Sequence, residues 1–171
     1  MNSRMTRPIR ILPALVLLAA CQATDTTPVD PSNATYVIER RTVTLRDGGF
    51  EEPAAPGSAA KATTRLVDKR ATGDLNGDGR PDAAVVLAST GGGSGTFYYV
   101  AALLGQGGGK GTATNAIVLG DRIGIDAVRI DGRTIVVDFL VRKPGEPFTT
   151  APSVKVARVF QVKDGALSET E

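Results

Sequence analysis

The chain of 171 residues has 20 basic and 18 acidic side chains, a formal net charge of +2, one cysteine and no histidine. This length suits one domain, and the absence of histidine excludes serine–histidine and cysteine–histidine catalysis and most catalytic zinc sites. Arg4, Arg7 and Arg10 lie in a segment that we expect to be removed, and without them acidic residues slightly outnumber basic ones. No basic run then remains, so the composition predicts no nucleic-acid partner.

Residues 1–20 have the pattern of a secretory signal, in which arginines precede a short apolar core at 11–20. That core is too short to span a bilayer, which requires about 20 apolar residues. The sequence Leu-Ala-Ala-Cys at 18–21 resembles the lipobox of bacterial lipoproteins. The resemblance implies that Cys21 is lipidated and becomes the N-terminus, and Gln22 in place of aspartate favours the outer membrane. The alternative is an ordinary cleaved signal that happens to precede a cysteine.

Residues 21–34, which begin with Cys21, are rich in Thr, Asp, Pro and Ser and are expected to form a flexible linker. After them, short segments rich in apolar residues are separated by Gly, Asp and Pro. The segments expected to be strands are 36–38, 43–45, 61–68, 83–88, 96–104, 114–119, 123–130, 134–142 and 154–162. This spacing predicts one mainly β domain over residues 35–171, with antiparallel strands in a sandwich or a partly closed barrel.

Oxygen-bearing groups recur at every second position of the segment 74–82. Those expected to bind calcium are Asp74, Asn76, Asp78, the carbonyl of Arg80, and Asp82. They match positions 1, 3, 5, 7 and 9 of a calcium loop, and Gly79 stands at position 6, where the chain turns sharply. Val85 replaces the bidentate glutamate of an EF-hand, so the affinity should be modest. The segment resembles the loops of FG-GAP and integrin-type repeats and the first half of dockerin loops. The alternative is an Asx-rich turn without an ion.

A glycine-rich segment at 91–95 leads into three aromatic residues at 97–99. Because glycines permit close approach of the backbone, one interpretation is a ligand-binding edge with contacts from Ser94, Tyr98 and Tyr99. The other is a flexible connector that leads into a core strand. Outside segment 74–82, the carboxylates that are candidates for glycan chemistry are Asp121, Asp126, Asp138 and Glu146. Their spacing along the chain does not indicate a catalytic pair.

Three segments, 73–85, 92–99 and 119–123, together resemble uncharacterised envelope lipoproteins of Gram-negative bacteria. The resemblance implies an envelope location and one compact domain, and it carries over no catalytic residue. We therefore expect a non-enzymatic lipoprotein on the periplasmic face of the outer membrane, a calcium-stabilised module that binds an envelope protein or glycan or has a structural role. An inhibitor or modulator of a periplasmic hydrolase is the second expectation, and a carboxylate-based glycan-acting enzyme is the third.

Overall fold

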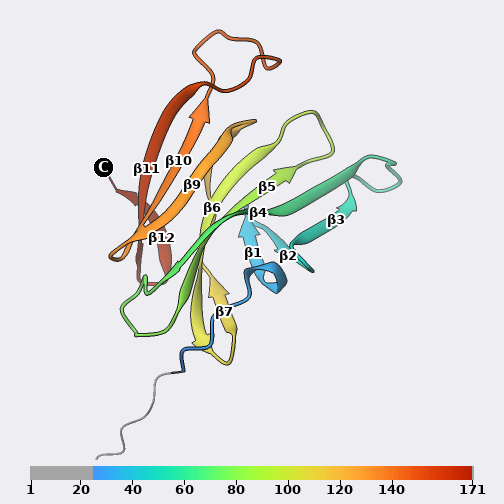
Figure 1. The fold of residues 1–171 in the computed structure, drawn as a ribbon. Helices are drawn as coiled ribbons and strands as arrows, with labels where there is room; N and C mark the ends of the chain where they lie inside the picture. Colours follow the sequence, from blue (N-terminus) through green and yellow to red (C-terminus); the bar gives the residue numbers. More distant parts are fainter. Residues whose placement is uncertain (1–24, 171) are drawn as a thin grey trace, which may run out of the picture.

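The computed structural model describes residues 25–170, which form a mainly β protein (Figure 1). The predicted antiparallel, sandwich-like fold is confirmed, and the described sheets do not close into a barrel. The strands are β1 (Thr35–Ile38), β2 (Arg41–Thr44), β3 (Gly49–Pro53), β4 (Lys61–Gly73), β5 (Asp82–Thr90), β6 (Phe97–Gly107), β7 (Lys110–Ala113), β8 (Ile117–Asp121), β9 (Gly124–Asp131), β10 (Thr134–Val141), β11 (Val154–Lys163) and β12 (Ala166–Thr170). Among residues 25–170, no helix is long and apolar enough to cross a bilayer. The expected signal segment 1–20 and Cys21 lie outside the described residues.

The described residues form three layers. The central sheet has the order β3-β4-β5-β6-β7, and β8 pairs with the first part of β6. A four-stranded sheet with the order β12-β11-β10-β9 lies on one side of it, and the β1–β2 hairpin lies on the other (Figure 1). Neighbouring strands in each sheet are antiparallel.

Strand β5 is buried on both faces, because it lies between two separate cores. Ala84 and Val86 face the four-stranded sheet, and Ala83, Val85 and Leu87 face the β1–β2 hairpin. A strand covered on both faces has apolar residues at every position instead of alternating with polar ones. This explains the unbroken apolar run that follows segment 74–82.

A bulge in β4 closes the sandwich along one side. Residues 67–69 of β4 stand opposite Val86 of β5 alone, and such an insertion bends the strand. Beyond the bulge, β4 packs against β9 of the four-stranded sheet. The approach is close enough that a Cβ on Gly73 would lie 3.0 Å from Cγ2 of Ile130. The end of β4 and the loop after it therefore lie next to the four-stranded sheet.

The packed part of the chain begins earlier than the sequence indicated. Residues 25–34, here called the N-terminal strap, lie in the expected linker, yet Val29 is buried in the core beneath the β1–β2 hairpin. The strap includes a 3₁₀ turn at Pro31–Asn33, which Asp30 caps through its carboxylate. The hydroxyl of Tyr36 donates to the carbonyl of Pro31 at 2.9 Å. Packing therefore extends into the expected linker at least as far as Val29, because one apolar side chain and local caps suffice to dock this polar segment.

Three strands were not expected from the sequence. β3 and β7 lie between the segments expected to be strands, and β12 lies beyond the last of them. β3 contains Glu51, Glu52 and Pro53, and such residues are tolerated because β3 forms an edge of the central sheet. All three strands lack the apolar alternation that marks a half-buried strand, so they can be recognised only from the strands with which they pair.

Candidate functional site

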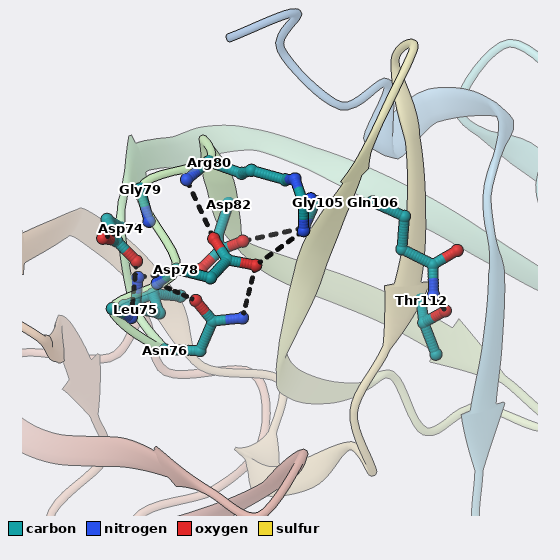
Figure 2. A network of polar contacts seen from close by, with 11 residues as sticks. Asp74, Leu75, Asn76, Asp78, Gly79, Arg80, Asp82, Gly105, Gln106 and Thr112 are labelled. Carbon is teal, nitrogen blue, oxygen red and sulfur yellow. Dashed lines mark hydrogen bonds and ion pairs between the residues drawn. The ribbon is translucent and has the colours of Figure 1, made fainter. Parts of the chain in front are cut away.

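Loop 74–82 joins β4 to β5 and is closed by hydrogen bonds to its own backbone (Figure 2). Asp74 Oδ1 accepts from Gly77 N at 2.6 Å, and Asp74 Oδ2 accepts from Gly79 N at 3.0 Å. Asn76 Oδ1 accepts from Asp78 N at 3.0 Å. Gly77 and Gly79 have φ values of +81° and +78°, which side chains with a Cβ rarely adopt. The chain therefore turns sharply at both glycines.

Two arginines supply positive charge at this loop. Arg80 N donates to Asp78 Oδ1 at 2.8 Å, and Arg80 Nη1 lies 3.3 Å from Asp78 Oδ2. The backbone bond from Arg80 is the main cause that holds the pKa of Asp78 below its usual value. The Arg133 guanidinium lies directly against Gly77, since a Cβ at that glycine would overlap it. Part of the negative charge of the loop is therefore balanced by the protein itself.

Asp82 points into the protein. It is fully buried at the first position of β5. Its Oδ2 accepts from Leu75 N at 2.8 Å, and its Oδ1 accepts from Gly105 N at 2.7 Å. One carboxylate therefore joins the loop to both β5 and β6, as Figure 2 shows.

The predicted calcium ligands share a loop, and their side-chain oxygens accept hydrogen bonds from the protein itself. Within residues 25–170, no group of three or more acidic, cysteine or histidine side chains is placed to hold a metal ion. Asp74, Asn76 and Asp78 accept hydrogen bonds from the backbone of the loop, and Asp82 bonds to Leu75 and Gly105 instead. In this conformation these side-chain oxygens are bonded to N–H groups of the protein. Calcium binding with modest affinity stays a prediction, and the geometry described is that of consecutive Asx turns.

The three residues expected to contact a ligand near the glycine-rich segment do not converge. Ser94 is exposed, and its carbonyl accepts from Arg122 Nη2 at 2.6 Å. Tyr98 packs against the core between the two larger sheets. Tyr99 points to the opposite face of β6, as alternation along a strand requires, and it is buried there. Tyr99 lines a cavity that also contains other polar groups.

That cavity lies between the β1–β2 turn and the beginning of β6 and has a volume of about 340 Å³. We call it the hairpin cleft and define it by Glu39, Arg41, Thr90, Phe97 and Tyr99. The Tyr99 hydroxyl donates to Glu39 Oε1 at 2.8 Å, and the Phe97 ring is 43% exposed. Burial, and secondly the hydrogen bond to Glu39, raise the pKa of Tyr99 above its usual value. A carboxylate, a guanidinium, hydroxyls and an aromatic ring therefore meet in one concave site.

The turn that carries Glu39 has an unusual backbone. Glu39 and Arg40, the two residues between β1 and β2, have φ values of +48° and +71°. Two-residue hairpins of this type usually have Asn-Gly at these positions, and a left-handed residue with a Cβ costs roughly 1–2 kcal/mol. Such strain often marks a functional position. Because neither residue is a turn former, the sequence did not reveal this site.

A second distinctive feature is the loop of residues 142–153 between β10 and β11, here called the arginine-clamped loop. It projects beyond the sheets at the end of the molecule opposite β7 (Figure 1). Phe148 is 64% exposed. The guanidinium carbons of Arg122 and Arg142 lie 4.3 Å and 5.7 Å from the centre of its ring. Arg142 also donates to the carbonyls of Arg122 and Phe148 at 2.8 Å and 3.0 Å. The exposed ring is thus held by the two arginines.

The carboxylates considered for glycan chemistry do not all meet. Asp121 accepts from Thr96 N at 2.9 Å, and Glu146 accepts from Lys143 N at 2.9 Å, so both stabilise loops. Asp126 and Asp138 do line one cavity of about 410 Å³. Asp138 is paired there with Arg129, an arrangement that also occurs without any catalytic role.

Comparison with known proteins found no matching family model, no matching curated relative and no matching solved structure. The resemblance to Gram-negative envelope lipoproteins therefore stays a prediction, as do the lipid anchor and the envelope location.

Proposed function

We propose that the protein is a non-catalytic binding module of the bacterial envelope. It is anchored to the outer membrane through lipidated Cys21 and presents its arginine-clamped loop to a partner protein. The observation that carries the proposal is Phe148, an exposed aromatic ring held in place by two arginines. Aromatic residues are prominent among the side chains that dominate interface energies. A side chain that is already fixed loses little entropy on binding.

The position of the loop supports a role away from the membrane. The N-terminal strap enters beside β7, where Asp25 accepts from the backbone of Gly108, and the arginine-clamped loop lies at the opposite end (Figure 1). A lipid on Cys21 would therefore direct Phe148 away from the anchored leaflet. The basic side chains near it, Arg122 and Arg142, favour a partner whose apolar pocket has an acidic rim.

Modulation of a periplasmic hydrolase is the second candidate function, and the backbone of the same loop favours it. Glu146 N donates to the carbonyl of Lys143 at 3.1 Å, and Thr150 N donates to the carbonyl of Pro147 at 2.9 Å. These bonds fix the shape of a single projecting loop, and preorganised loops lower the entropic cost of binding. The two candidates share a surface and differ in the partner.

Site-specific photo-crosslinking in the producing cell tests the proposal. A benzophenone side chain replaces Phe148 in one variant and Lys163, the exposed last residue of β11, in the control. We expect a discrete protein adduct from position 148 and none of the same mass from position 163. Identical adducts at both positions, or no adduct at 148, would refute the proposal. An adduct with a hydrolase would favour the second candidate.

The anchor is tested separately with Cys21→Ser. Incorporation of labelled palmitate should be lost in this variant, and the protein should move from the membrane fraction to the soluble fraction. Membrane association that is unchanged in Cys21→Ser would contradict the lipid anchor and leave the loop proposal untouched.

A further inference from the structure

We propose that the hairpin cleft binds one neutral sugar unit, either a free monosaccharide or the end of a glycan. The site is separate from the arginine-clamped loop, and the inference does not depend on a partner protein. Its volume of about 340 Å³ falls at the small end of the roughly 300–1,000 Å³ that is usual for ligand sites. The cleft therefore suits a single ring better than a long chain.

The groups in the cleft are those that recognise a ring bearing several hydroxyls. The Phe97 ring is 43% exposed and offers an apolar face to the C–H groups of a sugar. Glu39 accepts from the Tyr99 hydroxyl through Oε1, which leaves Oε2 as an acceptor for a ligand hydroxyl. The hydroxyl of Thr90 is paired with that of Thr63 at 3.2 Å and keeps a lone pair that can accept from the ligand. Apolar and polar contacts are thus presented together.

The charges in the cleft favour a neutral ligand. Glu39 is acidic and Arg41 is basic, and Arg41 is itself paired with Glu52 at 2.9 Å. Because the charges of Glu39 and Arg41 offset each other, neither an anionic nor a cationic ligand gains a strong net attraction. Hydroxyl groups can bond to both side chains, and hydrogen bonds to charged groups are the stronger ones.

The strained turn is an independent observation, and it indicates that Glu39 has a role other than stabilising the fold. Both turn residues adopt positive φ, where Asn and Gly fit better. A sequence chosen only for stability would have Asn or Gly at these positions. Glu39 instead places its carboxylate over the cleft, where it meets Tyr99 from a different layer of the protein.

The test uses the purified chain and a panel of free sugars followed by ligand-detected NMR and calorimetry. Glucose, galactose, mannose and N-acetylglucosamine are the neutral probes, and glucosamine and glucuronate are the charged comparators. We expect at least one neutral probe to bind more tightly than both charged probes. Phe97→Ala should weaken that binding by about tenfold or more, the effect of losing about 1.4 kcal/mol.

Glu39→Asn separates binding from folding. Asn tolerates a positive φ but loses the hydrogen bond from Tyr99, so this variant should unfold near the temperature of the parent and yet bind the sugar at least tenfold more weakly. Arg40→Gly is the matched control, because Arg40 is outside the cleft. It should raise the unfolding temperature, and it should bind like the parent. The proposal is overturned if no neutral probe binds, if a charged probe binds as tightly, or if Glu39→Asn and Phe97→Ala both bind like the parent.

Discussion

At the scale of single residues, Asp82 shows how a predicted metal ligand can be a structural residue. Its position in the oxygen pattern of segment 74–82 indicated calcium, but it is also the first residue of a strand that is buried on both faces. A carboxylate buried there must find hydrogen bonds. Leu75 N and Gly105 N supply them. The side chain therefore connects the loop to the central sheet, whatever the loop binds.

Replacement of Asp82 by asparagine should destabilise the fold by about 2–4 kcal/mol, measured by denaturant unfolding. The amide keeps one acceptor oxygen, but its NH₂ group faces a backbone N–H and cannot accept from it. The substitution therefore loses a hydrogen bond to a charged group, worth roughly 1.5–3 kcal/mol, and leaves a buried donor unpaired. Asp131→Asn, at an exposed turn, is the control and should change stability by less than about 0.5 kcal/mol. Equal effects of the two substitutions would contradict the structural role of Asp82.

The buried tyrosines should make stability fall in alkali. Burial, with smaller contributions from Asp30 and Glu39, raises the pKa of Tyr36 and Tyr99 above the usual value of 10.0. The folded state thus favours the neutral phenols, so their contribution is complete below pH 10 and is lost as the pH rises further. Unfolding free energies measured on both sides of pH 10 should decline, and the decline should be shallower in Tyr99→Phe. A slope unchanged by that substitution would rule out a contribution from Tyr99.

At the scale of elements, the sequence predicted the strands whose side chains pack in a core. It missed the edge strands, which are held mainly by backbone pairing with a neighbouring strand. The alternating or unbroken apolar patterns of β5, β6, β10 and β11 were sufficient to place them. The edges β3, β7 and β12 form because a neighbouring strand offers unpaired backbone groups, and no local pattern encodes that. The same limit applies to the candidate sites, since the hairpin cleft joins residues from the β1–β2 turn, β5 and β6. The sequence did predict a tight loop at 74–82, because Asx and Gly chemistry is local.

The arginine-clamped loop should loosen when Arg122 is removed. This guanidinium lies on the Phe148 ring and also holds the carbonyl of Ser94, and a cation–π contact alone contributes about 0.5–2 kcal/mol. We expect chymotrypsin to cleave after Phe148 several times faster in Arg122→Ala than in the parent. Arg129→Ala, on the four-stranded sheet, should leave the rate unchanged. If the two variants are cleaved at the same rate, the loop is not held by Arg122.

At the scale of the molecule, calcium binding depends on whether loop 74–82 can exchange some of its internal hydrogen bonds for bonds to the ion. An ion would have to compete with Arg80 for Asp78, which lowers the affinity further. If calcium binds at the roughly 10⁻³ M expected for an extracellular module, a tenfold excess would stabilise the fold by about 1.4 kcal/mol. Thermal unfolding should then shift upward with calcium but not with magnesium, and Asp78→Ala should abolish the shift. The absence of any shift in the parent would remove the metal prediction and leave the hydrogen-bonded turn.

If the protein is anchored through Cys21, the N-terminal strap sets the orientation of the domain relative to the membrane. If Cys21 carries the lipid, the chain from there to Asp25, whose carboxylate accepts from Gly108 N, reaches at most about 14 Å, so docking of the strap would keep the β7 end of the molecule near the membrane. Val29→Ala should therefore destabilise the fold by about 1–2 kcal/mol in denaturant unfolding, through lost burial and a small cavity. Thr26→Ala, exposed in the same segment, should change nothing. If both substitutions are neutral, residues 25–34 are the flexible linker that their composition predicts, and the direction of Phe148 is no longer fixed by the strap.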